Sequence, residues 1–332
     1  MRTLGVVFTA PGRVEVAEVE VPASEPGDVQ VRTLFSGISS GTEMLAFRGE
    51  IDGSVALDES IGSLEGAFDY PFRYGYSCVG VVEESRADIP EGKLVFAFHP
   101  HQARFATRSA DVVPLERADP RHATLFPHVE TALQVLLDAG AIAHELVAVL
   151  GMGAIGTLIA ALLARAGADV VCVEPKPWRR RAAEAFGLVC IEPNDAGEKV
   201  REMSRGRGAS LVVEASGNPD ILAGALELLA HEGTALVVSW YGNKLVSLPL
   251  GGPFHRRRLA LKSTQVSTIP AALSGRWSVA RRRAVAARLL EDLPLEALAT
   301  HVFPLDEAPA AFAAVDRGEE GLIHAALSYP GR

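Results

Sequence analysis

The sequence predicts an α/β protein with a β-rich, barrel-type domain and a doubly wound parallel-sheet domain. A chain of 332 residues exceeds what one hydrophobic core usually serves. A turn spaced by glycines joins an apolar strand to an apolar helix near residue 150, and strands alternate with helices after it. Residues 1–115 contain short apolar stretches broken by Gly and Pro, which favour twisted β-structure.

Composition excludes several classes of protein. With 48% hydrophobic residues, 31 Gly, 20 Pro and a formal net charge of -9, the chain is typical of a soluble α/β protein. An acidic balance disfavours a nucleic acid or another polyanion as partner. Arginine triplets occur at 179–181, 256–258 and 281–283. Such runs favour solvated helix faces over binding sites.

The N-terminal residues 1–22 alternate like a strand pair around Pro11 and Gly12. They lack the basic start, long apolar core and small-residue cleavage site of a signal peptide, so we expect a cytoplasmic protein. The cysteines Cys78, Cys172 and Cys190 each lie in an apolar run, which favours buried, inert thiols. No disulfide framework is expected.

Residues 146–164 carry no charge and are long enough to span a bilayer. Three glycines divide this run into a strand at 146–150, a turn and a helix with apolar residues at helical spacing. We therefore expect a buried strand, a tight turn and a packed helix, and no membrane partner.

The three glycines form a Gly-x-Gly-x-x-Gly dinucleotide fingerprint. Gly151 makes the turn, Gly153 lets backbone amides approach a pyrophosphate, and Gly156 lets helix and strand pack closely. Ala154 and Ile155 lie at the start of the helix, where the helix dipole favours phosphate. This unit predicts a Rossmann domain with a nicotinamide cofactor.

The strand that follows, residues 169–173, ends in Glu174, 18 residues after Gly156. A carboxylate there can accept both ribose hydroxyls of an unphosphorylated adenosine and repels a 2′-phosphate, which favours NAD. Lys176 and Arg179, with the two arginines after it, are the residue types that hold a 2′-phosphate. NAD is therefore the expected cofactor, and NADP stays open.

The remaining segments continue the alternating pattern. Further strands are expected near 188–191, 210–213, 234–240 and 259–264, with helices near 195–204 and 218–230. Residues 278–291 and 308–315 also favour helices.

This layout resembles the medium-chain dehydrogenase/reductase superfamily over almost the whole chain. The resemblance rests on four ordered segments: "FSGISSGTE" (35–43), "YGYSCVGVV" (74–82), "ARFATRSADVVPL" (103–115) and "FPHVETALQVL" (126–136). It implies a GroES-like catalytic domain at 1–122, the Rossmann domain at 123–266 and a return to the catalytic domain at 267–332. It also implies a small-molecule substrate and a homodimer.

In zinc-dependent members of this superfamily, three side chains hold a catalytic zinc ion. The matching positions here are Ser39 or Ser40, Tyr76 and about Pro127, and none is a competent zinc ligand. The four-cysteine lobe of a structural zinc is also missing. A substitute metal site would have to draw on separate segments, from among His99, His101, His128, Glu43 and Glu130. We therefore expect a zinc-independent enzyme.

Among the zinc-lacking branches, the chain resembles the group that includes 2-desacetyl-2-hydroxyethyl bacteriochlorophyllide dehydrogenase. The segments that carry this likeness are "SGISSGTE", "FHRRRLALKSTQVS" and "SWYGNK". The group implies NAD-dependent interconversion of a secondary alcohol and a ketone, with the substrate left open.

Three residues are candidates for handling the substrate proton. Thr42 matches the superfamily's proton-relay hydroxyl, although a threonine in a turn also commonly bonds local backbone. Tyr76 stands where a zinc ligand would face substrate, and its phenol would be a proton carrier if nearby cations lowered its pKa. The alternative is an aromatic filler of the vacated metal cavity. His101 lies on a segment expected to border the pocket.

Two further positions follow from the resemblance. Thr131 matches a residue that contacts the nicotinamide side of the cofactor. Glu43 matches an acid that orients the missing zinc-binding histidine, so its role here is open.

Two other functions are compatible with the same sequence features. One is an NADPH-dependent quinone or enoyl reductase, which needs no metal. The other is a nucleotide-binding protein that kept the fold but lost catalysis.

Overall fold

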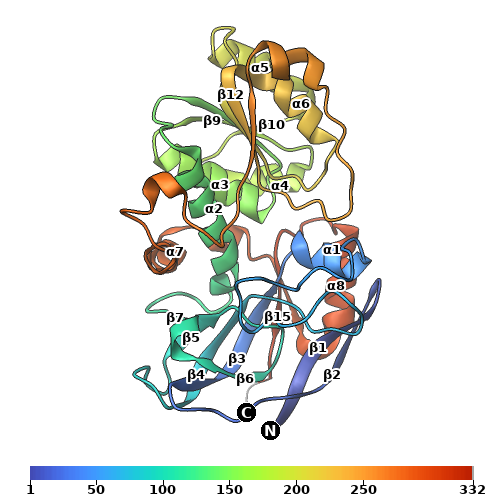
Figure 1. Ribbon diagram of the computed structural model, residues 1–332, viewed down its shortest axis with the longest axis vertical. Helices are drawn as coiled ribbons and strands as arrows, with labels where there is room; N and C mark the ends of the chain where they lie inside the picture. The colour runs from blue at the N-terminus through green and yellow to red at the C-terminus, as the bar shows by residue number, and fades with distance from the viewer. Residues whose placement is uncertain (331–332) are drawn as a thin grey trace. The chain divides into compact units, whose positions relative to one another are not determined.

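Two compact units make up the computed structural model, which describes residues 1–330 (Figure 1). Unit 1 comprises residues 1–127 and the chain from Arg283 onwards, and unit 2 comprises residues 128–282. The chain passes between the units within two helices, α2 (Phe126–Ala139) and α7 (Val279–Asp292). The sequence predicts domain boundaries after residues 122 and 266, near but not at these crossings.

Unit 1 is built on a seven-stranded sheet of order β14-β15-β3-β4-β5-β7, with β6 paired to β3, and a separate antiparallel pair, β1-β2. Its strands are β1 (Arg2–Ala10), β2 (Arg13–Glu20), β3 (Asp28–Ile38), β4 (Cys78–Ser85), β5 (Leu94–Ala97), β6 (Arg104–Arg108), β7 (Val112–Pro114), β14 (His301–Pro304) and β15 (Ala325–Ser328). Its own helices are α1 (Thr42–Arg48) and α8 (Ala308–Arg317).

Aromatic packing joins the two ends of the chain in the core of unit 1. Phe8 of β1 stacks on Phe72 at 5.1 Å between ring centroids and meets the edge of Phe312 of α8 at 5.3 Å. All three rings are buried. Burial of large aromatic side chains is the main favourable contribution to such a core. The core thus fixes α1 and the turn before β4, the segments that carry the candidate catalytic residues.

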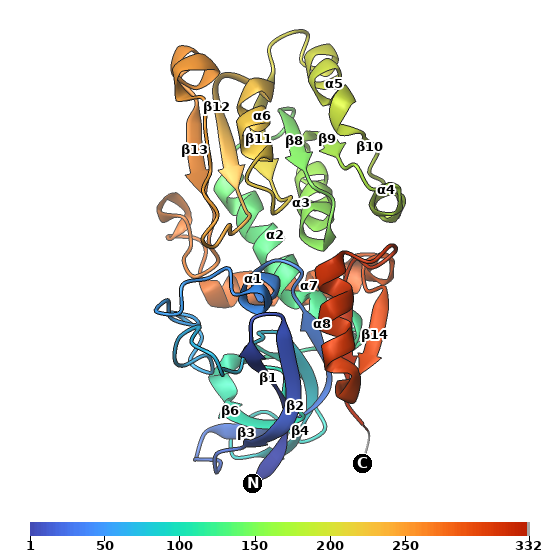
Figure 2. The ribbon, with the colours of Figure 1, turned by 90° about the vertical axis from the view of Figure 1, so that its right-hand side faces the viewer.

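Unit 2 is a six-stranded parallel sheet of order β10-β9-β8-β11-β12-β13, whose strands lie side by side in Figure 2. Its strands are β8 (Leu146–Leu150), β9 (Asp169–Val173), β10 (Cys190–Ile191), β11 (Ala209–Glu214), β12 (Leu229–Val237) and β13 (Ala260–Ser263). Its own helices are α3 (Ala154–Arg165), α4 (Pro177–Glu184), α5 (Ala196–Met203) and α6 (Ile221–Leu228). The predicted doubly wound α/β class is confirmed.

Some elements differ in length from their predictions. The strand predicted at 188–191 pairs over only two residues, Cys190 and Ile191, and Val189 before them is 82% exposed. The helix predicted at 218–230 ends at Leu228, and β12 begins directly after it.

The prediction that the third arginine triplet is a solvated face is wrong for Arg282. Its guanidinium is 1% exposed and binds Glu130 at 3.0 Å and Gln134 at 2.5 Å, both on α2. A buried guanidinium requires such a carboxylate partner and further acceptors. Arg282 therefore ties the start of α7 to Glu130 and Gln134 of α2 within unit 2.

The prediction of three buried, inert thiols is wrong for Cys190. Cys190 is partly exposed and lies directly opposite Cys172 in the β9-β10 pairing. A hydrogen bond from the Cys172 thiol lowers the pKa of Cys190. Cys78 and Cys172 are buried as predicted.

Within residues 1–330, every helix is too short or too polar to cross a lipid bilayer. The uncharged run at 146–164 forms β8, a turn and α3 instead.

Candidate active site

The glycine turn of unit 2 leaves no room for side chains at two positions. Gly151 has a φ of +93°, and a Cβ there would lie 2.6 Å from the Ser216 Cα atom. A Cβ on Gly156 would lie 1.8 Å from the Gly151 carbonyl oxygen, so α3 packs directly on the turn. Gly153 precedes the first residues of α3, Ala154 and Ile155, and the first turn of this helix carries no acidic residue. The backbone amides and the dipole at the N-terminus of α3 therefore favour a phosphate group.

Glu174 follows β9, and each of its carboxylate oxygens accepts a backbone amide, one of them from the glycine turn. Its Oε2 accepts the Met152 amide at 2.8 Å, and its Oε1 accepts the Lys176 amide at 2.9 Å. The residue is 2% exposed. A carboxylate offers about four lone-pair sites, so acceptor capacity remains for ribose hydroxyls. Glu174 thus shapes the glycine turn at 151–156, which we call the cradle, in addition to the ribose contact predicted for it.

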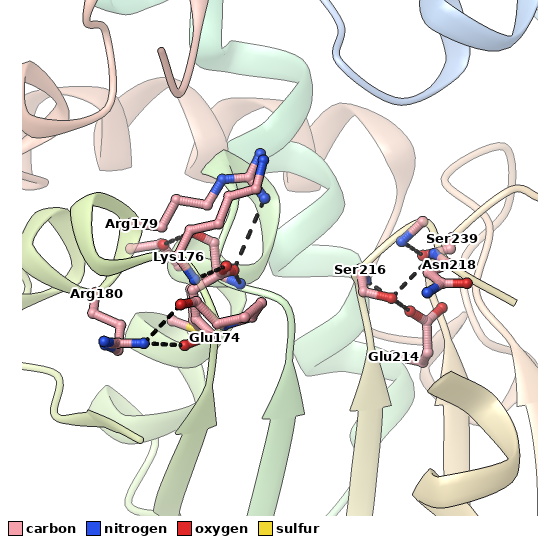
Figure 3. A network of polar contacts seen from close by, with 12 residues as sticks. Glu174, Lys176, Arg179, Arg180, Glu214, Ser216, Asn218 and Ser239 are labelled. Atoms are coloured by element: carbon pink, nitrogen blue, oxygen red, sulfur yellow. Dashed lines mark hydrogen bonds and ion pairs between the residues drawn. The ribbon is translucent and has the colours of Figure 1, made fainter. Parts of the chain in front are cut away.

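The basic residues after Glu174 divide into two kinds, as Figure 3 shows. Arg180 donates to the Glu174 and Pro175 carbonyls, each at 2.9 Å, and is held by the backbone. Arg179 reaches toward the turn, with Nη1 3.9 Å from Glu174 Oε2. Desolvation and the nearby Arg179 lower the pKa of Lys176. Arg179 is therefore the cation nearest the Glu174 carboxylate, while the Lys176 ammonium lies over the Trp178 ring, 5.1 Å from its centroid.

A second buried carboxylate, Glu214, ends β11 and was not predicted as a site residue. Its Oε1 accepts the Ser216 amide at 2.7 Å, and its Oε2 accepts the Tyr241 hydroxyl at 2.6 Å. Figure 3 shows this group with Ser239, whose hydroxyl accepts the Gly217 amide at 2.9 Å. Glu214 ends an apolar strand as Glu174 does, which is the sequence signal that would have found it.

Thr131, the remaining predicted cofactor residue, lies in α2 of unit 2 and is half-buried.

In unit 1, the candidate catalytic residues Tyr76 and Thr42 lie close to each other. The hydroxyls of Ser39 and Thr42 lie close enough to the Tyr76 phenol to favour its ionised form and lower its pKa. Burial, followed by the negative charge of Glu43, raises the pKa of Tyr76. The prediction of a phenol acidified by cations is wrong, because the charged neighbours are acidic. Tyr76 is therefore a hydrogen-bond donor near neutral pH.

His101 does not face a pocket, contrary to the prediction. It is 1% exposed, and both ring nitrogens are engaged: Nε2 lies 2.8 Å from Glu43 Oε2, and Nδ1 lies 2.7 Å from Ser36 Oγ. The Tyr329 hydroxyl lies 2.8 Å from the same Ser36 oxygen. This Ser-His-Glu order resembles a nucleophilic triad, but Ser36 is fully buried and no substrate reaches it.

The residues present do not fit a zinc ion. The positions matched to zinc ligands hold hydroxyl and proline side chains, and zinc in proteins is bound by thiolate, imidazole or carboxylate. Among residues 1–330, no three His, Cys, Asp or Glu side chains gather where they would hold a metal.

The substitute ligands have other partners. His99 stacks on Phe105 with ring centroids 4.0 Å apart and bonds the Pro100 carbonyl at 3.0 Å. Burial lowers the pKa of His99, and likewise that of His128, to about 4. Glu130 binds Arg282, as described above.

The chain is similar to known dehydrogenases. The family model described as "Zinc-binding dehydrogenase" matches residues 154–284, which exclude all the positions matched to zinc ligands. D-guloside 3-dehydrogenase of Escherichia coli (strain K12) is 27% identical over 296 residues, covering 82% of this chain and 84% of that protein.

Two further comparisons agree. 2-Desacetyl-2-hydroxyethyl bacteriochlorophyllide A dehydrogenase of Cereibacter sphaeroides is 26% identical over 261 residues, covering 73% of this chain and 75% of that protein. The crystal structure of 2R,3R-butanediol dehydrogenase from Bacillus subtilis has a TM-score of 0.79 at 18% identity, covering 99% of this chain and 100% of that one. At that identity the structural likeness shows the fold alone.

Proposed function

Because the chain belongs to the medium-chain dehydrogenase/reductase superfamily and is an oxidoreductase, we propose that it interconverts a secondary alcohol and a ketone with NAD and without zinc. The observation that carries this proposal is that the hydroxyls of Tyr76, Ser39 and Thr42 lie close together. The resemblance matches two of these positions, Ser39 and Tyr76, to zinc-ligand positions of zinc-dependent members. A neutral phenol polarises a carbonyl oxygen by hydrogen bonding and needs no Lewis acid.

The residues of unit 2 fit a dinucleotide. The first-turn amides of α3 would hold the pyrophosphate, because Gly153 brings the backbone there without a side chain. Glu174 would accept the adenosine ribose hydroxyls with its remaining lone pairs. The bound nicotinamide would supply the hydride chemistry. The carboxylate disfavours a 2′-phosphate, which supports NAD over NADP.

In unit 1, Tyr76 would donate its phenol hydrogen to the substrate oxygen. In the reductive direction, that oxygen gains negative charge and takes the phenol proton, and the phenolate is then reprotonated from solvent. In the oxidative direction, the phenol must first lose its proton to solvent before its oxygen can accept the proton of the alcohol. Thr42 and Ser39 would stabilise the transient phenolate with their hydroxyl hydrogens. Because Glu43 raises the pKa of Tyr76, the proton returns readily to the phenol.

The names of two relatives indicate where to look for the substrate. One is named for a 3-dehydrogenase reaction on a guloside, and another as an L-galactonate-5-dehydrogenase. Both names point to a secondary hydroxyl of a sugar derivative, and we propose that substrate class.

The test is an assay of chelator-treated protein against glycosides, sugar acids and vicinal diols, with NAD and NADP in parallel. We expect oxidation of at least one sugar-derived secondary alcohol with NAD. Turnover that appears only after zinc is added would contradict the proposal. Turnover confined to quinones or enones with NADPH would instead establish the reductase alternative.

A further inference from the structure

The imidazole of His101 contacts all three segments around the Tyr76 phenol. It bonds Ser36 near the end of β3 and Glu43 in the first turn of α1. Its ring also lies against Gly75, where a Cβ would be 2.6 Å from the His101 Cδ2 atom. One buried ring therefore joins β3, α1 and the turn that presents Tyr76.

Glu43 extends this connection to the hydroxyl partners of Tyr76. Its Oε1 accepts the Ser39 amide at 2.9 Å while its Oε2 binds His101. The bond fixes residues 39–43, the segment that carries both Ser39 and Thr42. Glu43 and His101 have no exposed side-chain surface. They therefore act on the site through position and charge, without touching substrate.

The hydrogen bonds of this group form a consistent series. A ring with its proton on Nε2 donates to Glu43 and accepts at Nδ1 from the Ser36 hydroxyl. Ser36 in turn accepts from the Tyr329 hydroxyl. Each polar atom of the ring has a partner, as a buried group requires.

We propose that His101 and Glu43 are a pair of positioning residues that hold the Tyr76 phenol and its hydroxyl partners in the geometry needed for proton transfer. The proposal rests on the proposed function of Tyr76. It replaces the role predicted for His101, that of a proton carrier in contact with substrate. In zinc-dependent relatives the acid matched to Glu43 orients a histidine at the position of Tyr76. Here Glu43 binds His101 instead.

The charges around Tyr76 act in the same direction. Glu43 and Asp58 are the charged groups that face it, and Tyr74 packs against it edge to face at 6.0 Å. Both carboxylates disfavour the phenolate. The positioning of Tyr76 by His101 and the effect of the Glu43 charge on the pKa of Tyr76 can therefore be tested by two different substitutions.

The first substitution, His101→Ala, removes the connecting ring. We expect kcat to fall by about ten- to a hundredfold, with the Kd of the cofactor unchanged, as for other groups that orient a catalytic side chain. Added imidazole should restore part of the loss. The control is His99→Phe, which alters a buried histidine two residues away and should leave kcat within about twofold of wild type.

The second substitution, Glu43→Gln, keeps the connection but removes the charge. The amide oxygen still accepts from Ser39, and the amide nitrogen donates to His101 Nε2 once the ring carries its proton on Nδ1. In the reductive direction kcat falls at high pH as the Tyr76 phenol ionises. We expect Glu43→Gln to move this fall to lower pH. The tyrosine ring-carbon NMR signal that disappears in Tyr76→Phe should titrate at lower pH as well.

The NMR titration separates the two proposals, because it needs no turnover. If wild type turns over no alcohol or ketone but Glu43→Gln shifts the Tyr76 titration and His101→Ala alters its signal, the proposed function fails and the pair stands. If His101→Ala keeps normal kcat, or if neither variant changes the Tyr76 signal, the pair is refuted.

Discussion

At the scale of single residues, Glu174 combines a structural and a recognition role. Its carboxylate holds the Met152 amide of the cradle and the Lys176 amide, and it lies 3.9 Å from Arg179. Glu174→Gln keeps one acceptor oxygen but removes the charge that repels a 2′-phosphate. We expect NAD to bind more weakly and NADP more tightly, shifting the preference by about tenfold or more.

Fluorescence titration with both cofactors measures this shift, and Arg179→Met in the same background should reverse the gain for NADP. If wild type already prefers NADP by more than about tenfold, or roughly 1.4 kcal/mol, the role assigned to Glu174 is wrong.

His99 is expected to make the free energy of unfolding depend on pH. Burial lowers its pKa to about 4, from the ordinary 6.5 that it regains on unfolding. Below pH 6.5 the unfolded chain binds the proton and the folded chain does not, so stability is complete above pH 6.5 and falls toward pH 4. A shift of this size is worth up to about 3 kcal/mol.

Urea unfolding of wild type and His99→Phe between pH 7 and pH 4 isolates this contribution. The phenyl ring still stacks on Phe105 but takes no proton, so the variant should lose less stability on acidification. Parallel curves for the two proteins would show that His99 has no part in the acid response.

At the scale of elements, strand β13 forms one edge of the unit 2 sheet, and all four of its residues are exposed. A strand edge with unpaired amides and carbonyls favours pairing with another copy. Leu261 adds an apolar side chain that is 42% exposed. We therefore expect a homodimer joined through β13, with Leu261→Asp converting it to monomer.

Analytical ultracentrifugation gives the oligomeric state. Val189→Asp is the matched control, because it adds the same charge beside β10 at the opposite edge of the sheet and should leave the dimer intact. A dimer that survives Leu261→Asp but dissociates with Val189→Asp would place the interface at the other edge.

Helices and strands that depend on residues close together in the sequence could be predicted. The run of β8, glycine turn, α3 and β9 follows from apolar periodicity and glycine spacing within about thirty residues. The length of β10 could not be predicted, because strand pairing at a sheet edge decides it. The burial of Arg282 could not be predicted either, because it depends on the packing of α7 against α2.

At the scale of the whole molecule, the candidate site was only partly predictable for the same reason. Glycine spacing and a strand-ending glutamate mark the cradle locally. The bond between Glu43 and His101 joins residues 58 apart in the chain, and Ser36 and Tyr329 are 293 apart. No local pattern carries such contacts, so the sequence showed His101 as a free proton carrier.

The sign of the pKa shift at Tyr76 has the same origin. It depends on which charges the fold brings near the phenol, and these are acidic. Sequence position alone identified the residue but not its state of ionisation.

Turnover by Tyr76→Phe in the presence of chelator, with cofactor affinity measured on the same protein, tests whether the phenol acts on the substrate. The substitution changes one oxygen in unit 1 and leaves the cradle in unit 2 untouched. If the phenol polarises the substrate oxygen in place of a metal, kcat should fall by about two to four orders of magnitude while the Kd of NAD stays the same. Near-normal turnover by Tyr76→Phe would contradict the account and leave the tyrosine as a filler of space.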